Sequence, residues 1–408
     1  MNENKRGRPL VSITAKGENS VKNGHPWVYE GEVTGLTGEI TDGELVEVIS
    51  PKGRFLGTGF YNSHSKIRVR LISTNANDRF DEAFYLRRLT HAWEHRKTVM
   101  GDDRDCCRLI FGEADLFPGL TVDRFGDILV TQTLSLGIEK IKPMLFNGLH
   151  RILTADGESI RGIYERNDVA IRKLEGMEEG KGFFPLDGLP TPDCTETVIC
   201  ENGIRYHVDF ENGQKTGFFL DQKYNRRAAA KLAPGKRVLD CFTHTGSFAM
   251  NAAAAGAAHV HAVDISKDAV AMAQRNAELN GLTNMSFEAA NVFDLLPALE
   301  KQGSPYDYII LDPPAFTKSS QTVDSAIRGY KEINLRAMKL LPRGGYLATC
   351  SCSHFMTEQL FIKMLRSAAF DAKVSLRQIE ARQQSPDHPI LWNVPETNYL
   401  KFFLFQVF

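Results

Sequence analysis

The chain has 408 residues, of which 42% are hydrophobic and 24% are charged. At roughly 150 residues per domain, this length predicts two or three domains with hydrophobic cores, and the composition excludes a disordered or collagen-like chain. Lys and Arg number 49 and Asp and Glu number 50, so the net charge is −1 and gives no global attraction to nucleic acid or membrane.

The chain carries neither a membrane-span pattern nor a secretory pattern. No apolar run approaches the roughly 18 residues of a span, and the first residues lead into no apolar signal core. The seven cysteines are odd in number and form no C-x-x-C of zinc-site spacing. We therefore expect a soluble, cytoplasmic protein with free thiols, no metal site and no membrane partner.

Residues 1–76 alternate short β-type runs with glycine-containing turns, which predicts a small β-barrel. Lys66, Arg68 and Arg70 lie at a period of two on one strand, so their side chains share a face. Such a stripe can contact RNA phosphates. On charge alone, a solvated strand face explains it at least as well.

Residues 77–190 combine helical and strand patterns. Apolar residues recur at helical spacing over 81–100, short strand-like runs follow at 120–123 and 128–132, and a second helix is predicted near 138–154. This order predicts a central α+β domain. Closely spaced prolines between Pro185 and Pro192 then indicate a linker.

Residues 191–408 begin with two β-type runs that flank Asn202-Gly203, a strong hairpin signal. From about residue 236, strands alternate with helical segments, which specifies a Rossmann-like α/β domain with a mostly parallel sheet covered on both faces. The apolar end, 398–408, is expected to form a last strand. The other strands of this sheet are predicted near residues 237–241, 259–263, 284–289, 306–311 and 344–350.

The first two strands of this domain end in acidic residues, Asp240 and Asp264. Ligands of open α/β sheets bind at the carboxyl ends of strands, and a carboxylate there can accept hydrogen bonds from a ribose diol. Gly246 is the only glycine in the first turn, so the pattern is not G-x-G-x-x-G and disfavours a nicotinamide dinucleotide. An adenosine cofactor carrying an amino acid and no phosphates fits better, with strand-end caps as the alternative.

The fourth strand leads into Asp312-Pro313-Pro314-Ala315-Phe316. Two prolines make a rigid extended turn that leaves the Asp312 carboxylate directed into the cleft. Asp312 can accept a hydrogen bond from an exocyclic base amine, and Phe316 can stack on a base. An ordinary proline loop is the alternative.

The fifth strand leads into Cys350-Ser351-Cys352-Ser353-His354. A lone cysteine is usually a small buried hydrophobe. Cys352, however, lies just past a strand whose neighbour ends in Asp312, so the two side chains can share a cleft. Cys350 lies deeper and is better explained by packing. His354 is a candidate proton carrier, although an exposed histidine with no role explains it equally well.

Together, these motifs resemble the ribosomal RNA large subunit methyltransferase I family, whose members use S-adenosylmethionine to form 5-methylcytosine in large-subunit ribosomal RNA. The resemblance extends over nearly the whole chain. Gly24–Tyr29 resembles the family's amino-terminal RNA-binding barrel of the PUA type, and Lys215–Gln222 resembles the segment before its methyltransferase core. Asp312–Phe316 and Ser351–Ser353 are similar to its catalytic motifs, and Asp387–Pro389 and Tyr399–Lys401 to its closing segment.

The resemblance implies a class I methyltransferase domain, S-adenosyl-L-methionine as cofactor, and 23S ribosomal RNA or a large-subunit precursor as partner. It makes Cys352 the nucleophile, assisted by Asp312. For RNA it implies contacts from Pro313, Pro314 and Phe316, besides the Lys66, Arg68 and Arg70 stripe. The cofactor-binding residues that it implies are Lys215, Phe219, Gln222, Asp240, Phe242, Thr243, Thr245, Gly246, Ser247, Asp264, Ile265, Asn291, Val292 and Asp312.

Two positions depart from the family. Asn291 stands where relatives often have an aspartate near the adenine. Related RNA cytosine-5 methyltransferases carry a second cysteine after the aspartate-proline of the fourth strand, whereas Pro313-Pro314 has none. The group that drives product release is therefore unidentified.

Three functions stay open at this point. Methylation of cytosine carbon 5 needs covalent activation of the ring by a thiolate. Methylation of an amino group, adenine N6 or guanine N2, needs no cysteine, so Cys352 discriminates between the two. A ribosome-assembly RNA-binding protein without catalysis would need none of Asp240, Asp264, Asp312 and Cys352. The target nucleotide stays undetermined, as does the choice between a monomer and a homodimer.

Overall fold

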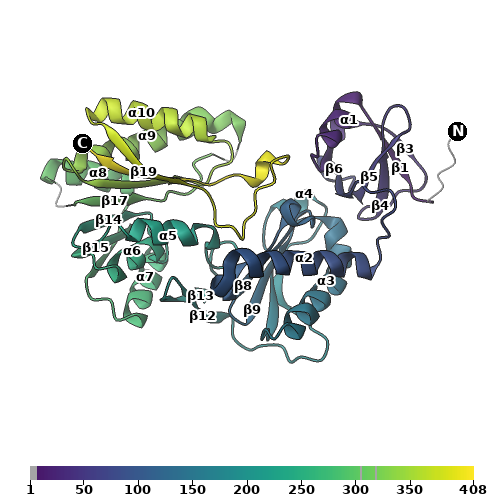
Figure 1. Ribbon diagram of the computed structural model, residues 1–408, viewed down its shortest axis with the longest axis horizontal. Coiled ribbons are helices and arrows are strands. Elements are labelled where there is room, and N and C mark those ends of the chain that lie inside the picture. The colour runs from purple at the N-terminus through teal and green to yellow at the C-terminus, as the bar shows by residue number, and fades with distance from the viewer. Residues whose placement is uncertain (1–6, 304–305, 318) are drawn as a thin grey trace. The chain divides into compact units, whose positions relative to one another are not determined.

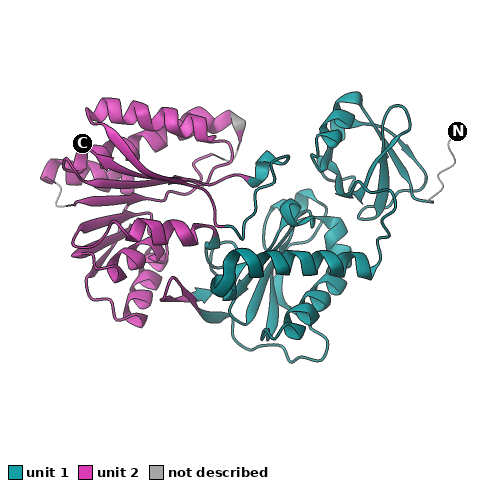
Figure 2. Cartoon of the chain, in the orientation of Figure 1, with its two compact units in different colours: residues 1–198, 208–220, 386–397 teal, residues 199–207, 221–385, 398–408 magenta. Residues whose placement is uncertain are grey.

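The computed structural model describes residues 7–303, 306–317 and 319–408; residues 1–6 of the predicted barrel lie outside this part. Internal contacts divide the chain into two compact units (Figure 2). The first comprises residues 1–198, 208–220 and 386–397, and the second comprises 199–207, 221–385 and 398–408. Among the described residues, none of the helices is both long and apolar enough to cross a membrane.

The first unit begins with a six-stranded sheet of order β2-β6-β5-β4-β1-β3 (Figure 1). Its core is aliphatic and includes Val11, Val28, Val46 and Val69, all of them fully buried. The predicted small β-structure is therefore present. Its elements are β1 (Leu10–Ile13), α1 (Ala15–Lys22), β2 (Trp27–Tyr29), β3 (Val33–Thr37), β4 (Leu45–Ile49), β5 (Phe55–Tyr61) and β6 (Ile67–Ser73).

The rest of the first unit has a five-stranded sheet of order β11-β10-β9-β8-β7 with two long helices. The helix α2 (Glu82–Met100) begins after Asp81, whose side chain accepts from the Phe84 backbone N–H as an N-cap. The predicted α+β pattern is confirmed. The other elements are β7 (Cys106–Phe111), β8 (Leu120–Phe125), β9 (Ile128–Thr133), α3 (Leu136–Ala155), β10 (Gly162–Arg166), α4 (Ile171–Leu174) and β11 (Lys181–Phe184).

The predicted hairpin is formed by β12 (Glu196–Glu201) and β13 (Ile204–Asp209). Asn202 and Gly203 have φ values of 54° and 80°, the two left-handed conformations that a tight hairpin turn requires. Short 3-10 helices also occur, at Glu30–Glu32, Gly101–Asp105, Gly112–Asp115, Leu220–Gln222, Ser320–Thr322 and Pro395–Thr397.

The second unit has a seven-stranded sheet of order β16-β15-β14-β17-β18-β20-β19. The first five of these strands are parallel, and the last two join antiparallel. This confirms the mostly parallel sheet; β19 was not predicted. The elements are α5 (Lys223–Ala230), β14 (Arg237–Cys241), α6 (Ser247–Ala254), β15 (His259–Asp264), α7 (Lys267–Leu279), β16 (Met285–Ala289), α8 (Val292–Gln302), β17 (Tyr308–Leu311), α9 (Val323–Leu340), β18 (Tyr346–Ser351), α10 (Glu358–Ala372), β19 (Leu376–Arg382) and β20 (Lys401–Val407).

Helices cover both faces of this sheet (Figure 1). Side chains alternate along β17, so Ile309 and Leu311 pack in the cluster with α8, α9 and α10, whereas Tyr308 and Ile310 pack in the cluster with α5 and α6. The strand order reverses between β14 and β17, because the chain runs outward through β15 and β16 before it returns. The carboxyl ends of β14, β15, β17 and β18 therefore meet at a topological switch point, where ligands of such sheets bind.

Candidate active site

The turn that follows β14 has an unusual backbone. Phe242, His244 and Gly246 all have positive φ, at 63°, 51° and 85°. Left-handed conformations are costly for side chains other than glycine and accumulate at ligand-binding sites. A Cβ on Gly246 would lie 2.6 Å from Cε of Met250 and 3.0 Å from Cβ of Ala273. The turn is therefore tightly packed against α6 and α7.

Asp240 lies at the base of this turn, fully buried. Its Oδ2 accepts from Thr243 Oγ1 at 2.6 Å and from the Ala249 backbone N–H at 3.0 Å. Its Oδ1 is buried without a hydrogen-bond partner among the described residues, and the same holds for Thr245 Oγ1 nearby. Burial raises the pKa of Asp240 to about 7. A buried acceptor oxygen that lacks a donor among the described residues suits a cationic ligand group, such as the ammonium of a methionine moiety.

Asp264, at the end of β15, links two loops. Its Oδ2 accepts from the His244 backbone N–H at 2.9 Å, and its Oδ1 accepts from the Ser266 backbone N–H at 3.0 Å. Ile265 beside it is 73% exposed and offers an apolar surface to a ring. Asn291 caps α8 by accepting from the Phe293 backbone N–H, and Val292 is buried. The carboxylate thus ties the turn after β14 to the loop after β15.

Asp312, at the end of β17, interacts with two side chains of this unit. Gln222 Nε2 donates to its Oδ1 at 3.0 Å, and the thiol of Cys350 interacts with the carboxyl and lowers its pKa. Burial and the charge of Asp221 raise the pKa of Asp312 to about 6, against the opposing effects of Arg226 and Gln222. A carboxyl that titrates near neutral pH can either hold a proton or accept one.

The two cysteines of β18 and its loop occupy different environments. Cys350 is fully buried, and burial raises the pKa of its thiol well above the usual value, which makes it a poor nucleophile. Cys352 is only partly buried. The next residue is held in place, because Ser353 Oγ donates to the Thr317 carbonyl at 3.0 Å. His354 is exposed, and its ring contacts the Phe355 ring edge-on.

Phe316 lies in a cluster of aromatic rings. Its centroid is 4.6 Å from that of Tyr330, 5.8 Å from Phe293 and 6.4 Å from Phe242. The cluster joins the turn after β17 to α8, to α9 and to the turn after β14. Ser351 Oγ donates to Tyr330 Oη at 3.1 Å. Of the two prolines, Pro313 is buried and Pro314 is exposed.

Two predicted cofactor contacts, Lys215 and Phe219, belong to the first unit, and Lys215 Nζ lies 4.8 Å from the centroid of the Phe219 ring. Lys215 is exposed and has a φ of 53°. Since they belong to another unit than the turn after β14, these two contacts stay predictions. Gln222, Phe242, Thr243, Gly246 and Ser247 lie in the second unit with the site.

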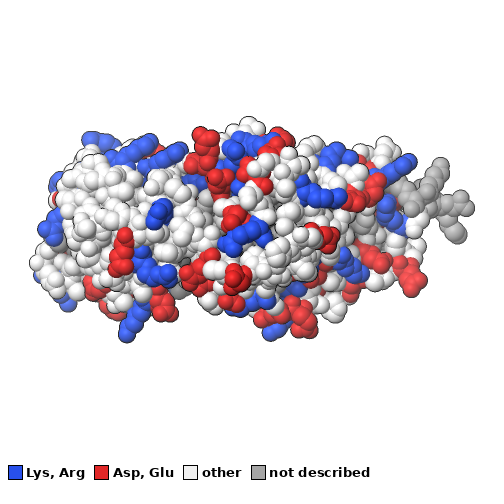
Figure 3. Space-filling model, turned by 90° about the horizontal axis from the view of Figure 1, so that it is seen from below, with Lys and Arg blue, Asp and Glu red and all other residues white. Residues whose placement is uncertain are grey.

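The basic stripe of the barrel is mostly engaged in ion pairs. Arg68 pairs with Glu30 at 2.6 Å, and Arg70 pairs with Glu175 at 2.9 Å. Lys66 is exposed. On the face of the molecule in Figure 3, Lys and Arg side chains alternate with Asp and Glu side chains. Contact with RNA at this stripe thus stays a prediction, for which Lys66 is the accessible candidate.

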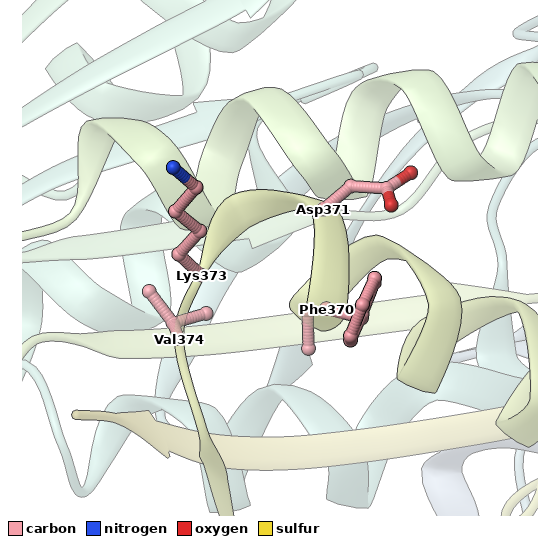
Figure 4. Close-up of a pocket in the computed structure, with 5 residues that line it drawn as sticks. Phe370, Asp371, Lys373 and Val374 are labelled. Atoms are coloured by element: carbon pink, nitrogen blue, oxygen red, sulfur yellow. The ribbon is translucent and has the colours of Figure 1, made fainter.

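A cavity of about 660 Å³ lies away from these strand ends, at the end of α10, and Phe370, Asp371, Lys373 and Val374 are among the residues that line it (Figure 4). Arg343, which precedes β18, donates to the Lys373 carbonyl. The cavity is therefore at the amino end of β18, opposite the edge that holds Asp312 and Cys352, and we do not assign it to the site.

Sequence reasoning did not identify one charged residue of the site. Lys401 begins β20 and pairs in register with Ser351, the last residue of β18. Its Nζ donates to the Ser353 carbonyl at 2.6 Å and to the Tyr399 carbonyl at 2.8 Å. The available signals were a single lysine at the head of an otherwise apolar strand and the similarity of Tyr399–Lys401 to the family's closing segment.

Residues 188–406 match the protein family described as S-adenosylmethionine-dependent methyltransferase, and residues 11–74 match the PUA-like domain. Among solved structures, a methyltransferase of Streptococcus mutans is similar with a TM-score of 0.80 at 24% identity, covering 97% of this chain and 99% of that one. A methyltransferase solved in complex with SAH has a TM-score of 0.81 at 23% identity with the same coverage. These likenesses confirm the fold.

Curated relatives extend over nearly the whole chain. The ribosomal RNA large subunit methyltransferase I of Cronobacter sakazakii is 40% identical over 399 residues, covering 97% of this chain and 98% of the relative. The protein of that name from Escherichia coli O1:K1 / APEC has the same identity and coverage. The unpartnered Asp240 oxygen and the tight turn around Gly246 fit S-adenosylmethionine as the cofactor. The chain belongs to the ribosomal RNA large subunit methyltransferase I family, whose members are S-adenosylmethionine-dependent methyltransferases.

Proposed function

We propose that this protein methylates carbon 5 of a cytosine in large-subunit ribosomal RNA through a covalent intermediate on Cys352. The observation that carries the proposal is a partly exposed thiol just past the end of β18, beside β17, which leads directly into Asp312. An amino-group methyltransferase would have no use for this thiol. The substrate class rests on the relatives that are 40% identical, which are ribosomal RNA large subunit methyltransferases I.

Cytosine carbon 5 is a poor nucleophile, and the proposed role of Cys352 is to change this. The thiol first loses its proton to solvent, and the thiolate then adds to carbon 6, which forms an S–C6 bond and makes the ring enamine-like. Asp312 stabilises the adduct at ring nitrogen 3, where its pKa of about 6 allows it to supply a proton or a hydrogen bond.

S-adenosylmethionine, when bound, supplies the electrophilic methyl group from its sulfonium. Asp240 holds the cationic amino-acid end, and Asp264 accepts hydrogen bonds from the ribose. Carbon 5 of the adduct forms a bond to the methyl group as the S–CH3 bond breaks, and that electron pair stays on the sulfur as a neutral thioether. The carbon 5 proton then leaves to a base, and the electron pair of that C–H bond restores the ring as the S–C6 bond breaks. Cys352 then leaves as a thiolate.

Cys350 is the competing nucleophile, and its surroundings argue against it. Its thiol is fully buried, and burial raises its pKa well above the usual value. It interacts with the Asp312 carboxyl, whose pKa it lowers. We therefore assign Cys350 to packing and to support of the Asp312 carboxyl.

The proposed RNA partner is 23S ribosomal RNA or a large-subunit precursor, and the proposed location of the enzyme is the cytoplasm. The match of residues 11–74 to the PUA-like domain supports a contribution of the barrel to RNA affinity. The target base must be unstacked to enter the site, at a cost of a few kcal/mol. Pro313, Pro314 and the aromatic cluster around Phe316 are proposed to receive it.

The test uses RNA that contains 5-fluorocytosine, because fluorine at carbon 5 cannot leave as a proton. We expect wild-type enzyme and Cys350→Ala to form a denaturant-stable RNA adduct, and Cys352→Ala to form none while it retains affinity for the cofactor. Mass spectrometry of ribosomal RNA from a deletion strain should show loss of one 5-methylcytosine. A Cys352→Ala enzyme that still methylates RNA would replace this proposal by amino-group methylation, and an unchanged RNA in the deletion strain would favour a non-catalytic RNA-binding role.

A further inference from the structure

Lys401 is a buried cation in an apolar strand. The residue is 5% exposed, and those that follow it in β20 are mostly large and apolar. Lysine is almost never buried to this degree unless its charge is put to use or compensated. Two of its three N–H donors point to carbonyls, those of Ser353 and Tyr399, at 2.6 and 2.8 Å. Carbonyl dipoles solvate the ammonium but do not neutralise it.

The position of Lys401 in the sheet brings it beside Cys352. Antiparallel pairing of β18 with β20 sets Lys401 opposite Ser351, so one neighbour of Cys352 is held by the sheet. Ser351 Oγ also bonds to Tyr330 Oη. The other neighbour, Ser353, is held by the Lys401 ammonium at its carbonyl and by Thr317 at its hydroxyl. The backbone on both sides of Cys352 is thus fixed.

The charges that act on Lys401 come from two elements. Cys352, in the loop after β18, and Glu358, in the first turn of α10, both favour its protonated form, whereas burial opposes it. The balance lowers the pKa of Lys401 to about 8, so the side chain is mostly an ammonium at pH 7. Arg382 lines a cavity of about 220 Å³ with Lys401 and Glu358, but its guanidinium bonds to Glu380 and Asn225.

We propose that Lys401 is the positioning residue of Cys352: its ammonium fixes the loop at Ser353 and stabilises the Cys352 thiolate. This inference rests on the proposed function, in which that thiolate adds to the base. The electrostatic attraction acts on both groups. An anionic Cys352 stabilises the Lys401 ammonium, and the ammonium stabilises the Cys352 thiolate to the same extent. A fixed cation near a thiol increases the thiolate fraction and with it the reactivity. The thiol proton is released to solvent.

The experiment separates the charge from the hydrogen bonds. Lys401→Gln can still donate to the two carbonyls but is neutral, and Lys401→Arg keeps the charge. Lys363→Met, at an exposed lysine of α10, is the control. The rate of iodoacetamide alkylation at Cys352 is followed against pH by peptide mass spectrometry, which resolves Cys352 from the exposed Cys194 and Cys200. Cofactor affinity by calorimetry shows which variants fold.

We expect Lys401→Gln to raise the midpoint of Cys352 alkylation by about one pH unit, which is a tenfold loss of thiolate below the midpoint. Methylation at pH 7 should fall by a similar factor and recover as the pH rises to 9. Lys401→Arg and Lys363→Met should keep the wild-type midpoint. An unchanged midpoint in Lys401→Gln, or an equal shift in Lys401→Arg, overturns the inference.

Two further measurements test the role of Lys401 if Lys401→Gln does not fold, and distinguish its failure from failure of the proposed function. If Lys401→Gln does not fold, wild-type protein with 13C-labelled cysteine is titrated by NMR, and a Cys352 that is still a neutral thiol at pH 8 overturns the inference. The 5-fluorocytosine adduct is measured in parallel. Absence of that adduct in wild-type enzyme refutes the proposed function, whereas an adduct together with an unchanged alkylation midpoint in Lys401→Gln refutes only the role of Lys401.

Discussion

Gln222 donates a 3.0 Å hydrogen bond from Nε2 to Oδ1 of Asp312. The orientation of its amide is fixed, because its Oε1 accepts from Asn225 Nδ2 at 2.7 Å. The carboxyl is therefore drawn in two directions: the amide donor favours the ionised form, while burial and the charge of Asp221 favour the protonated form. Burial and Asp221 prevail, and the pKa rises to about 6.

This raised pKa predicts a pH-dependent cost in stability. The unfolded carboxyl titrates near pH 3.9, so the folded protein binds more protons between roughly pH 4 and 6. The Asp312 carboxyl therefore destabilises the folded protein least at low pH. Its cost in stability grows as the pH rises through about 6 and is complete above about pH 7. Asp312→Asn should have a higher Tm than wild type at pH 8 and nearly the same Tm at pH 4, by calorimetry without cofactor.

The matched control for this titration is Asp268→Asn, at an exposed residue in the first turn of α7. Its difference in Tm from wild type should be small at both pH values. A difference between Asp312→Asn and wild type that does not change with pH would show that the Asp312 carboxyl titrates normally. Asp312→Asn should also lose methylation activity, since it can no longer supply a proton.

Replacing Asp264 by Ala should weaken cofactor binding by roughly 1–3 kcal/mol. The substitution removes the acceptor proposed for the ribose and the bonds to the backbone N–H groups of His244 and Ser266. Calorimetric titration with S-adenosylmethionine measures the loss, with Asp268→Ala as the control. Unchanged affinity in Asp264→Ala would remove this residue from the site.

Gly246 and Gly256 provide a matched pair for the cofactor turn. Both have positive φ, 85° and 95°, but a Cβ on Gly256 would meet nothing within 4 Å. Alanine at either position carries the left-handed backbone cost of about 1–2 kcal/mol. Only at Gly246 would the Cβ also crowd Met250 Cε of α6 at 2.6 Å and Ala273 Cβ of α7 at 3.0 Å, so that the turn or these neighbours must shift. Gly246→Ala should therefore lose cofactor affinity, whereas Gly256→Ala should lower Tm alone; equal cofactor affinity in the two variants would contradict this.

Replacing Arg70 and replacing Lys66 by Met should have different effects on stability and on RNA binding. The Arg70 guanidinium pairs with Glu175, whose side chain is 5% exposed, so Arg70→Met leaves a nearly buried carboxylate without its cation and should cost about 3 kcal/mol of stability. Lys66→Met should leave Tm unchanged but weaken RNA binding and reduce its salt slope by about 1. Thermal unfolding and filter binding at several salt concentrations measure both. A stable Arg70→Met protein with weaker RNA binding would assign Arg70 to the RNA surface instead.

Much of the second unit could be predicted from sequence, since its signals are local. Apolar runs that end in Asp240, Asp264 and Asp312 predict strands whose carboxyl ends meet, and parallel topology brings those ends together without any knowledge of side-chain contacts. The hairpin at Asn202-Gly203 followed from its two turn residues.

The remaining features depend on residues that are far apart in the chain. Lys401 reaches Ser353 only because the last strand returns antiparallel beside β18, and a single lysine in an apolar run carries no sign of that partner. In the same way, Arg70 looked available for phosphate, because Glu175 is 105 residues away in sequence. The periodicity of apolar residues in a sequence does not reveal ion pairs between residues that are far apart in the chain.

The path of the chain between its two units affects the order in which the protein can fold during synthesis. The guanidinium of Arg96, in α2, is completely buried; it pairs with Asp115 and donates to the Asp387 carbonyl, 291 residues further along the chain. A nascent chain that stops before residue 386 therefore leaves this cation without one of its partners in the first unit. Because a buried donor that lacks its acceptor is costly, that unit is expected to reach its final stability only after almost the whole polypeptide has been translated, which leaves prematurely terminated chains open to proteases.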